Sequence, residues 1–145
     1  MRILAVDLGK VRTGLAVCDE GERLASPAGV VQEYNREKLA HTVAEQAATH
    51  GVGEIVVGLP RNLDGSEGES AQGARAFAEQ LQELVTVPVM MQDERGTTIT
   101  AHGYLNDTDT RGKKRKAVVD AVAATIILED YLMRRRNLNR SSLGE

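Results

Sequence analysis

The chain has 145 residues, and its content of 41% hydrophobic and 27% charged residues is that of one globular domain with a core of its own. No apolar stretch reaches the roughly 20 residues that a membrane span needs, and the first residues lack a cationic and then apolar leader, so we expect a cytoplasmic protein without membrane contact. The single cysteine, Cys18, excludes an internal disulfide and a cysteine-based zinc cluster, and its place in an apolar run predicts a buried side chain.

Charge is divided unevenly along the chain. Residues 1–110 carry a net charge of −8, whereas residues 111–145 carry +5. Five of the six residues at 111–116 are basic, and four further arginines follow near the end of the chain. An acidic body with basic clusters at one end is typical of a protein that binds a polyanion. A solvated loop and a solvated helix end would give the same pattern, so that alternative stays open.

The first predicted element is a β-hairpin. Two short aliphatic runs, residues 3–6 and 15–18, flank a turn that contains glycine. The first run ends at Asp7, which therefore lies at the mouth of the hairpin beside Lys10 and Arg12. A carboxylate next to two cations and flexible backbone suits a metal or phosphate site, but Asp is equally common as a plain turn residue.

Strands and helices alternate through the rest of the chain. Residues 23–31 form a third predicted strand, in which Pro27 indicates a sheet edge or a bulge. Ser70 is the expected N-cap of the helix predicted at 70–85. The apolar periodicity predicts helices at 36–50 and 70–85, strands at 54–58 and 87–92, a helix from 97 or 98 to 105, a basic loop at 111–116 and a last helix at about 115–134.

This order predicts an α/β fold: a mixed five-stranded sheet, three antiparallel strands followed by alternating strands and helices, with helices on both faces. We expect residues 1–138 to form a single domain and residues 139–145 to be a flexible C-terminal tail. In such sheets, ligands gather at the carboxyl ends of the strands. Asp93 and Glu94 follow the fifth strand as Asp7 follows the first, so these carboxylates converge if the two strands lie near each other.

A third candidate acid lies in the last helix. Asp120 is the only ionisable residue in the apolar segment 117–128, and the small residues Ala123 and Ala124 follow it one turn later. A buried carboxylate has to be protonated, paired or bound to a metal, because its desolvation is costly. A salt bridge to Arg95 or Arg12 is the structural alternative. Three converging acids would suit a hard cation such as Mg²⁺.

These motifs together resemble the YqgF/RuvX family of bacterial proteins, which have a ribonuclease H-like fold. Four segments carry the resemblance, in the same order and over nearly the whole chain. They are residues 6–14, the strand end 57–60 with the loop 64–68, residues 93–98 and residues 120–124. One departure is Gly96, where the family pattern has a bulky apolar residue.

The resemblance implies a metal-dependent phosphodiester nuclease. Its catalytic acids would be Asp7, Glu94 and Asp120, with Asp93 beside them as a further candidate metal ligand. The implied substrate is the 5′ end of pre-16S ribosomal RNA. The alternatives are resolution of Holliday junctions on branched DNA, or nucleic-acid or ribosome binding without catalysis.

The implied mechanism uses two Mg²⁺ or Mn²⁺ ions about 3.5–4 Å apart, which activate water and stabilise the leaving oxygen. Cations near the acids would bind the phosphates, although Arg95 could instead pair with Asp93. The loop 60–68 is either a lid over nucleic acid or a plain connection. The expected phosphate contacts are Lys10, Arg12, Arg61, Arg95, Lys113, Lys114, Arg115 and Lys116. The expected partners are RNA or branched DNA and pre-ribosomal particles, bound by a monomer or homodimer.

Overall fold

The computed structural model describes residues 1–94 and 112–143, and within its last helix it describes the side chains of residues 122–138. The elements are, in chain order, β1 (Ile3–Asp7), β2 (Arg12–Cys18), β3 (Ala25–Gln32), α1 (Arg36–His50), β4 (Glu54–Leu59), α2 (Glu69–Gln82), β5 (Val89–Asp93) and α4 (Gly112–Leu143). In the described part of the chain, every helix is too short or too polar to span a bilayer.

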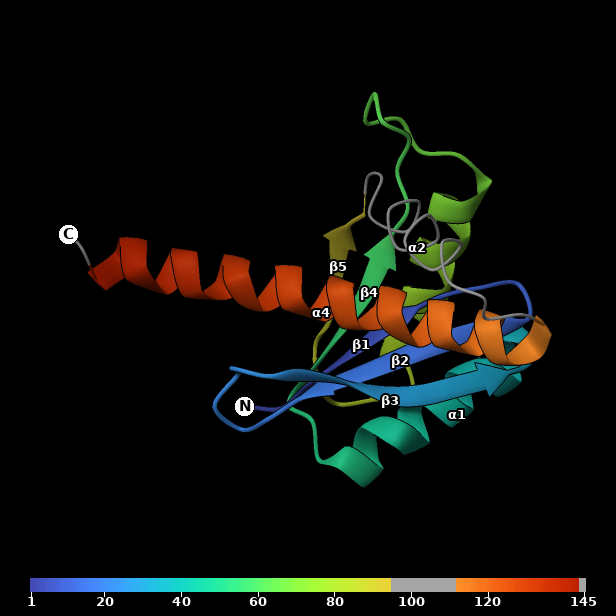
Figure 1. The fold of residues 1–145 in the computed structure, drawn as a ribbon, viewed down its shortest axis with the longest axis horizontal. Coiled ribbons are helices and arrows are strands. Elements are labelled where there is room, and N and C mark those ends of the chain that lie inside the picture. The colour runs from blue at the N-terminus through green and yellow to red at the C-terminus, as the bar shows by residue number, and fades with distance from the viewer. Residues whose placement is uncertain (95–111, 144–145) are drawn as a thin grey trace.

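The five strands form one mixed sheet in the order β3-β2-β1-β4-β5 (Figure 1). The pairs β1–β2 and β2–β3 are antiparallel, whereas β1–β4 and β4–β5 are parallel. Strand β4 therefore separates β1 from β5, and all three end at the same edge of the sheet. The predicted arrangement of strands is confirmed.

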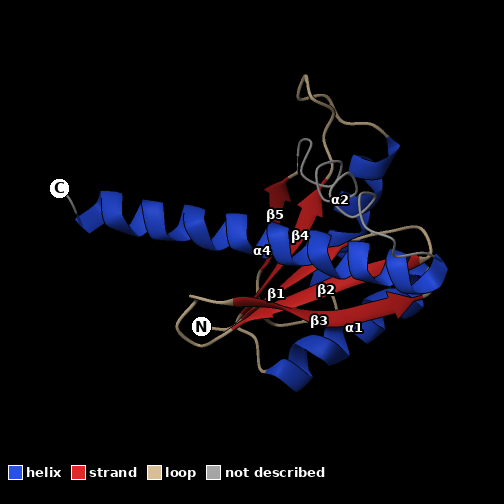
Figure 2. Ribbon diagram, in the orientation of Figure 1, coloured by secondary structure: helices blue, strands red, loops and turns tan. Residues whose placement is uncertain are grey.

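Each face of the sheet buries its own core, because successive side chains of a strand point to opposite faces. Leu4 and Val6 of β1 pack in the core under α1 and α2. Ile3 and Ala5 of the same strand pack in the second core, which α4 covers from the other side. Figure 2 shows α4 crossing the near face of the sheet, with α1 on the far side, so the predicted cover on both faces is confirmed.

The edge position of β3 explains its proline. The strand pairs only with β2, and its register shifts between Leu15 and Ala16, whose partners are Gly29 and Pro27. Gly29 has a φ of 122°, which glycine adopts without steric cost. The expected edge and bulge are therefore both present. Cys18 is 3% exposed, as its apolar surroundings predict.

Helix α1 has the predicted bounds, whereas α2 begins earlier than predicted. The Asn35 side chain accepts a hydrogen bond of 3.0 Å from the Lys38 N–H at the start of α1. The N-cap of α2 is Gly68 and not Ser70, and no side chain caps that end of the helix. The prediction failed because Ser70 has the right residue type for a cap, but the helix already begins at Glu69.

Helix α4 is longer than predicted at both ends. It begins at Gly112, so residues 113–116 lie in its first turns, and the prediction of a loop there is wrong. Lys and Arg have high intrinsic helix propensity, which lets the helix extend through the cluster although cations are unfavourable at a helix N-terminus. Residues 139–143, expected in a flexible tail, belong to the same helix.

Two contacts show the direction in which α4 crosses the sheet. The Tyr131 hydroxyl donates a hydrogen bond of 2.8 Å to Glu54, the first residue of β4. Ile127 lies against Gly58, near the end of β4, where an added Cβ would come within 2.7 Å of its Cδ1 atom. Going back along α4 thus means going toward the carboxyl ends of the strands. Position 120 is about 10.5 Å before Ile127 along the helix axis.

The contact at Gly58 gives a first testable prediction. In Gly58→Ala, the new methyl group would lie 2.7 Å from Ile127 Cδ1 and 3.2 Å from Glu94 Cγ, so we expect a loss of about 1–3 kcal/mol of unfolding free energy. The matched control is Gly73→Ala, where nothing lies within 4 Å of the new Cβ in helix α2 and a gain of about 0.5–1 kcal/mol is expected. Urea unfolding measures both. A Gly58→Ala protein as stable as the wild type would contradict the described packing of α4 on β4.

Candidate active site

Asp7 is the last residue of β1 and lies on the α4 side of the sheet. Ile3 and Ala5 belong to the core under α4, so the alternation of side chains directs Asp7 to the same side. Its neighbour in the antiparallel pair is Gly14 of β2, which has no side chain to fill the space beside the carboxylate. The carboxylate therefore lies at the carboxyl edge of the sheet, as the sequence predicts.

Glu94 lies on the same side as Asp7. Glu94 follows β5 directly, and its backbone N–H donates a hydrogen bond of 2.9 Å to the Leu59 carbonyl. The residue is 4% exposed. Its Cγ atom would lie 3.2 Å from a Cβ on Gly58, which places the side chain in the space that glycine leaves on the α4 side. Since β4 alone separates β1 from β5 in the sheet that the described residues form, Asp7 and Glu94 extend from strands about 10 Å apart.

Asp93 points to the other side of the sheet. Val89 and Met91 of β5 pack against the core under α1 and α2, and alternation gives Asp93 the same direction. There its Oδ2 atom lies 3.8 Å from Nη1 of Arg61. The sequence left both Asp93 and Glu94 as candidate metal ligands, and the strand geometry favours Glu94.

The third candidate acid, Asp120, has a backbone position on the side of α4 that covers the sheet. Ala123, Ala124 and Ile127 of α4 are buried against the sheet. Residue 120 precedes Ile127 by nearly two full turns, so the helix backbone carries this position on the stripe that covers the sheet. The side chain of Asp120 lies outside the described residues. Among the side chains that are described, no three acids, histidines or cysteines form a metal-binding group.

The β1–β2 turn carries Lys10 and Arg12 past Asp7, and it requires glycine. A Cβ on Gly9 would lie 2.0 Å from the Arg12 carbonyl oxygen, which no side chain can accommodate. The Gly9 carbonyl in turn accepts a hydrogen bond of 2.8 Å from Nη1 of Arg36, in the first turn of α1. Sequence reasoning missed Arg36, because its partner is 27 residues away and no local pattern marks the pair.

Arg61 is engaged by carboxylates. Its Nη2 atom lies 3.2 Å from Oε2 of Glu67, in addition to the contact with Asp93. Glu67 also accepts two hydrogen bonds of 2.7 and 2.8 Å from Arg75, and these bonds are the main reason that the pKa of Glu67 is lowered. Arg61 therefore links the loop 60–68 to the end of β5, and Glu67 links the same loop to α2. Its predicted role as a phosphate contact stays a prediction.

Three features predicted from the sequence lie outside the described residues. They are the phosphate contact Arg95, the departure from the family pattern at Gly96 and the helix at 97–105. The side chains of Lys113, Lys114, Arg115 and Lys116 are likewise not described, although their backbone is helical.

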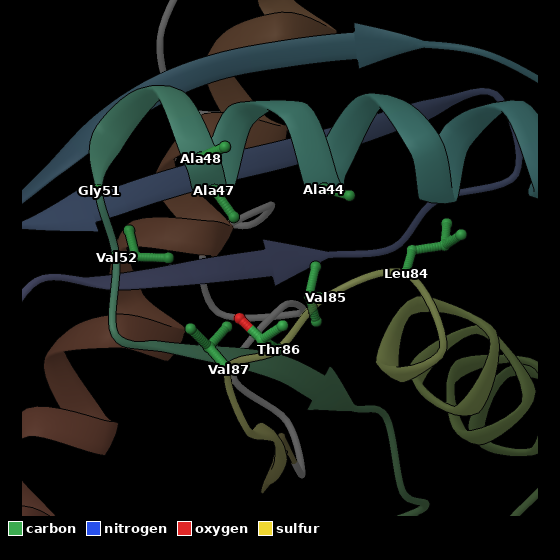
Figure 3. A pocket seen from close by; sticks show the side chains of 9 residues that line it. All are labelled: Ala44, Ala47, Ala48, Gly51, Val52, Leu84, Val85, Thr86 and Val87. Atoms are coloured by element: carbon green, nitrogen blue, oxygen red, sulfur yellow. The ribbon is translucent and has the colours of Figure 1, made fainter.

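A separate pocket of about 300 Å³ lies at the opposite end of the strands (Figure 3). Ala47, Gly51 and Val52 line it just before β4, and Leu84 and Val87 line it before β5. Its lining is aliphatic apart from the hydroxyl of Thr86, so it offers little chemistry for phosphate transfer. Asp7 and Glu94, by contrast, lie at the carboxyl ends of β1 and β5.

The described acids fit a divalent metal by their chemistry. Asp7 and Glu94 offer only carboxylate oxygens, and Mg²⁺ is commonly held by one or two carboxylates while it keeps water or takes phosphate oxygens for the remaining positions. A buried carboxylate such as Glu94 is also costly to keep charged without a cation nearby.

The mixed sheet, with acids at the carboxyl ends of β1 and β5 and a long helix across one face, defines a ribonuclease H-like protein. Solved structures agree on the fold. The fowlpox virus Holliday junction resolvase aligns with a TM-score of 0.56 at 13% identity, over 92% of this chain and 99% of that one. Thermus thermophilus RuvC in complex with a Holliday junction substrate aligns with a TM-score of 0.53 at 14% identity, over 94% of this chain and 96% of that one.

The chain belongs to the RuvX family, described as Holliday junction resolvase, whose model matches residues 1–134. The alignments with curated relatives span nearly the full length of both proteins. A protein of Anaeromyxobacter sp. (strain Fw109-5) is 44% identical over 91% of this chain and 96% of its own, and one of Chloroflexus aurantiacus (strain ATCC 29366 / DSM 635 / J-10-fl) is 39% identical over 96% and 92%. Both are named "Putative pre-16S rRNA nuclease". The resemblance drawn from the sequence is therefore confirmed.

Proposed function

We propose that this protein is a metal-dependent phosphodiester hydrolase that processes the 5′ end of pre-16S ribosomal RNA. The observation that carries the proposal is the placement of Asp7 and Glu94 on one side of the sheet, at the carboxyl ends of β1 and β5. The names of the relatives, at 39–45% identity, support the RNA substrate. The proposed setting is the cytoplasm, with pre-ribosomal particles as partners.

In this proposal, Asp7, Glu94 and Asp120 would hold Mg²⁺ or Mn²⁺, with two ions present when substrate is bound. When bound, the metal supplies Lewis acidity and a water of lowered pKa. Lys10 and Arg12 bind the non-bridging phosphate oxygens, and the rigid turn at Gly9, fixed by Arg36, orients them. Glu94 is 4% exposed, so it would offer its carboxylate from the buried side of the site.

A second candidate function is the resolution of Holliday junctions. The description of the matching family favours it, and so does the fold shared with two junction resolvases. A third possibility from the sequence, a binding factor without catalysis, would keep the fold and the basic segment but not need the acids. These functions differ in the substrate that is cut and in the dependence on metal.

One experiment separates the three. The purified protein is given a 16S ribosomal RNA fragment with a 5′ extension, a four-way DNA junction and a linear DNA duplex, each with Mn²⁺ and with EDTA. We expect metal-dependent cleavage of the RNA extension. Cleavage of the junction alone would favour the resolvase, and binding without cleavage of any substrate would favour the binding factor.

The basic segment at the start of α4 gives a further prediction. Replacing Lys113, Lys114, Arg115 and Lys116 with Ser should weaken nucleic-acid binding about equally for different sequences, because contacts to phosphates carry no sequence information. Each lost contact should lower the slope of log K against log salt by about 0.9 on duplex DNA or about 0.7 on single strands. Cleavage at saturating substrate should persist.

The control for this variant changes charge at the far end of the same helix. In Arg134→Ser with Arg136→Ser, two exposed cations are removed about 30 Å farther along α4. Titrations at several salt concentrations measure both proteins. If only the control altered the salt slope, the polyanion would lie along the distal half of α4.

A further inference from the structure

A second charged cluster lies at the opposite end of the sheet from the acids. It consists of Tyr131 and Arg135 of α4, Glu54 at the start of β4, and Glu22 in the β2–β3 connection, and we call it the α4 anchor. The Tyr131 hydroxyl donates a hydrogen bond of 2.8 Å to Oε2 of Glu54, and Nη1 of Arg135 lies 3.4 Å from the same oxygen. Arg135 Nε donates a further hydrogen bond of 2.7 Å to Oε1 of Glu22.

The anchor holds α4 against two separate parts of the sheet. Tyr131 and Arg135 are one helical turn apart and therefore lie on the same side of α4. Glu54 belongs to the parallel half of the sheet, and Glu22 to the connection between two antiparallel strands. Among the described residues, Glu22 is the only non-glycine residue with a positive φ, 56°, a conformation that costs free energy and persists where surrounding contacts maintain it.

The charges of the anchor are partly removed from water. Glu54 is 8% exposed, and burial is the main reason that the pKa of Tyr131 rises to about 12, so its phenol stays protonated and donates to Glu54. The hydrogen bond from Arg135 is the main reason that the pKa of Glu22 is lowered. The Arg135 and Glu22 side chains are 29% and 24% exposed, so the ion pair adds little stability by itself, and the geometry that its hydrogen bonds define is the feature of interest. The apolar side chains of Ile127, Leu128 and Leu132 also pack this stretch of α4 against the sheet.

We infer that the α4 anchor is a positioning device for the metal site, because it fixes how far α4 slides and rotates over the sheet and hence where position 120 stands relative to Asp7 and Glu94. The inference rests on the proposed function. Position 120 is about 16 Å from Tyr131 along a continuous helix, so the helix transmits a shift at one end to the other. A rotation of α4 about its axis by roughly 25° would move the Cα at position 120 by about 1 Å, and misplacement of a catalytic group by that distance can cost about 100-fold in rate.

Two substitutions remove parts of the anchor and leave all three acids in place. Tyr131→Phe removes only the hydroxyl, and Arg135→Met removes the charge but keeps most of the side-chain length. The matched control is Val43→Ala, which opens a cavity in the core under α1, on the other side of the sheet from α4. It destabilises the protein without touching the anchor.

The readout is the dissociation constant of Mn²⁺, measured by electron paramagnetic resonance of the free ion well below the unfolding temperature of each variant. We expect Tyr131→Phe and Arg135→Met to bind Mn²⁺ more weakly than wild type by about 10-fold, the low end of the range for residues in direct contact with metal ligands, because the anchor acts on position 120 through the helix. Val43→Ala should bind within about twofold of wild type, since its metal ligands keep their orientation.

Three results would overturn the inference. Unchanged Mn²⁺ affinity in both anchor variants would show that the cluster only adds stability. Equal weakening in Val43→Ala would show that general destabilisation, and not the anchor, controls the site. Wild-type protein without any Mn²⁺ binding would overturn the proposed function itself, and the anchor with it, which distinguishes that failure from the other two.

Discussion

Asp7→Asn should reduce metal-dependent cleavage by more than about 100-fold, and Asp120→Asn should do the same. Loss of residues that merely orient metal ligands already costs about 10- to 100-fold, so loss of a ligand itself should cost more. The amide has almost the volume of the carboxylate but lacks its charge, which a hard cation requires. Both proteins should fold as the wild type does. Single-turnover cleavage with Mg²⁺, together with circular dichroism, measures the two effects.

The control for the helix position is Asp130→Asn. Asp130 lies on α4 as Asp120 does, but it follows Ile127, the residue that packs over the end of β4, whereas Asp120 precedes it. Its substitution removes the same charge from the same helix and should leave cleavage unchanged. Wild-type cleavage by Asp7→Asn or by Asp120→Asn would remove that residue from the proposed metal site.

Glu94→Gln and Asp93→Asn should differ strongly although the residues are adjacent. Glu94 lies on the α4 side with Asp7, whereas Asp93 lies on the other side and contacts Arg61 at 3.8 Å. We expect Glu94→Gln to lose more than about 100-fold in cleavage for the reason given for Asp7. Asp93→Asn should lose its ion pair with Arg61, which is partly exposed and worth about 0–1 kcal/mol of stability, and should keep cleavage.

The comparison of these two variants is internally controlled, because each removes one carboxylate charge at the same strand end. Steady-state cleavage and thermal unfolding should be measured side by side. If Asp93→Asn were the inactive protein and Glu94→Gln the active one, the strand alternation used to place the site would be wrong at the end of β5.

Much of the fold follows from local sequence. Two apolar runs around a glycine turn indicated the hairpin of β1 and β2, and apolar periodicity gave both ends of α1; the structure adds the caps Asn35 and Gly51 there. The start of α2 could not be predicted in this way, because its N-cap, Gly68, makes no side-chain cap. The start of α4 was also predicted wrongly, because the run of cations at 111–116 was interpreted as a loop, whereas the helix already begins at Gly112.

The site was only partly predictable, because it depends on tertiary contacts that local sequence does not indicate. Asp7 and Glu94 could each be placed at a strand end, but the choice between Asp93 and Glu94 depends on which side each residue faces, and that depends on the core partners of Val89 and Met91. Contacts between residues far apart in the chain were not predictable at all. Arg36 with Gly9, and Tyr131 with Glu54, have no local signal that pairs them.

The most direct test of the account is a crystal of the protein soaked in Mn²⁺, with anomalous diffraction used to locate the ion. The central claim is that Asp7, Glu94 and Asp120 share a metal site between the carboxyl ends of β1 and β5 and helix α4. We predict an anomalous peak at about 2.0–2.2 Å from carboxylate oxygens of all three residues, the range for oxygen ligands of small divalent metals. A fully soaked crystal with no peak there, or with Mn²⁺ bound only by other residues, would contradict it.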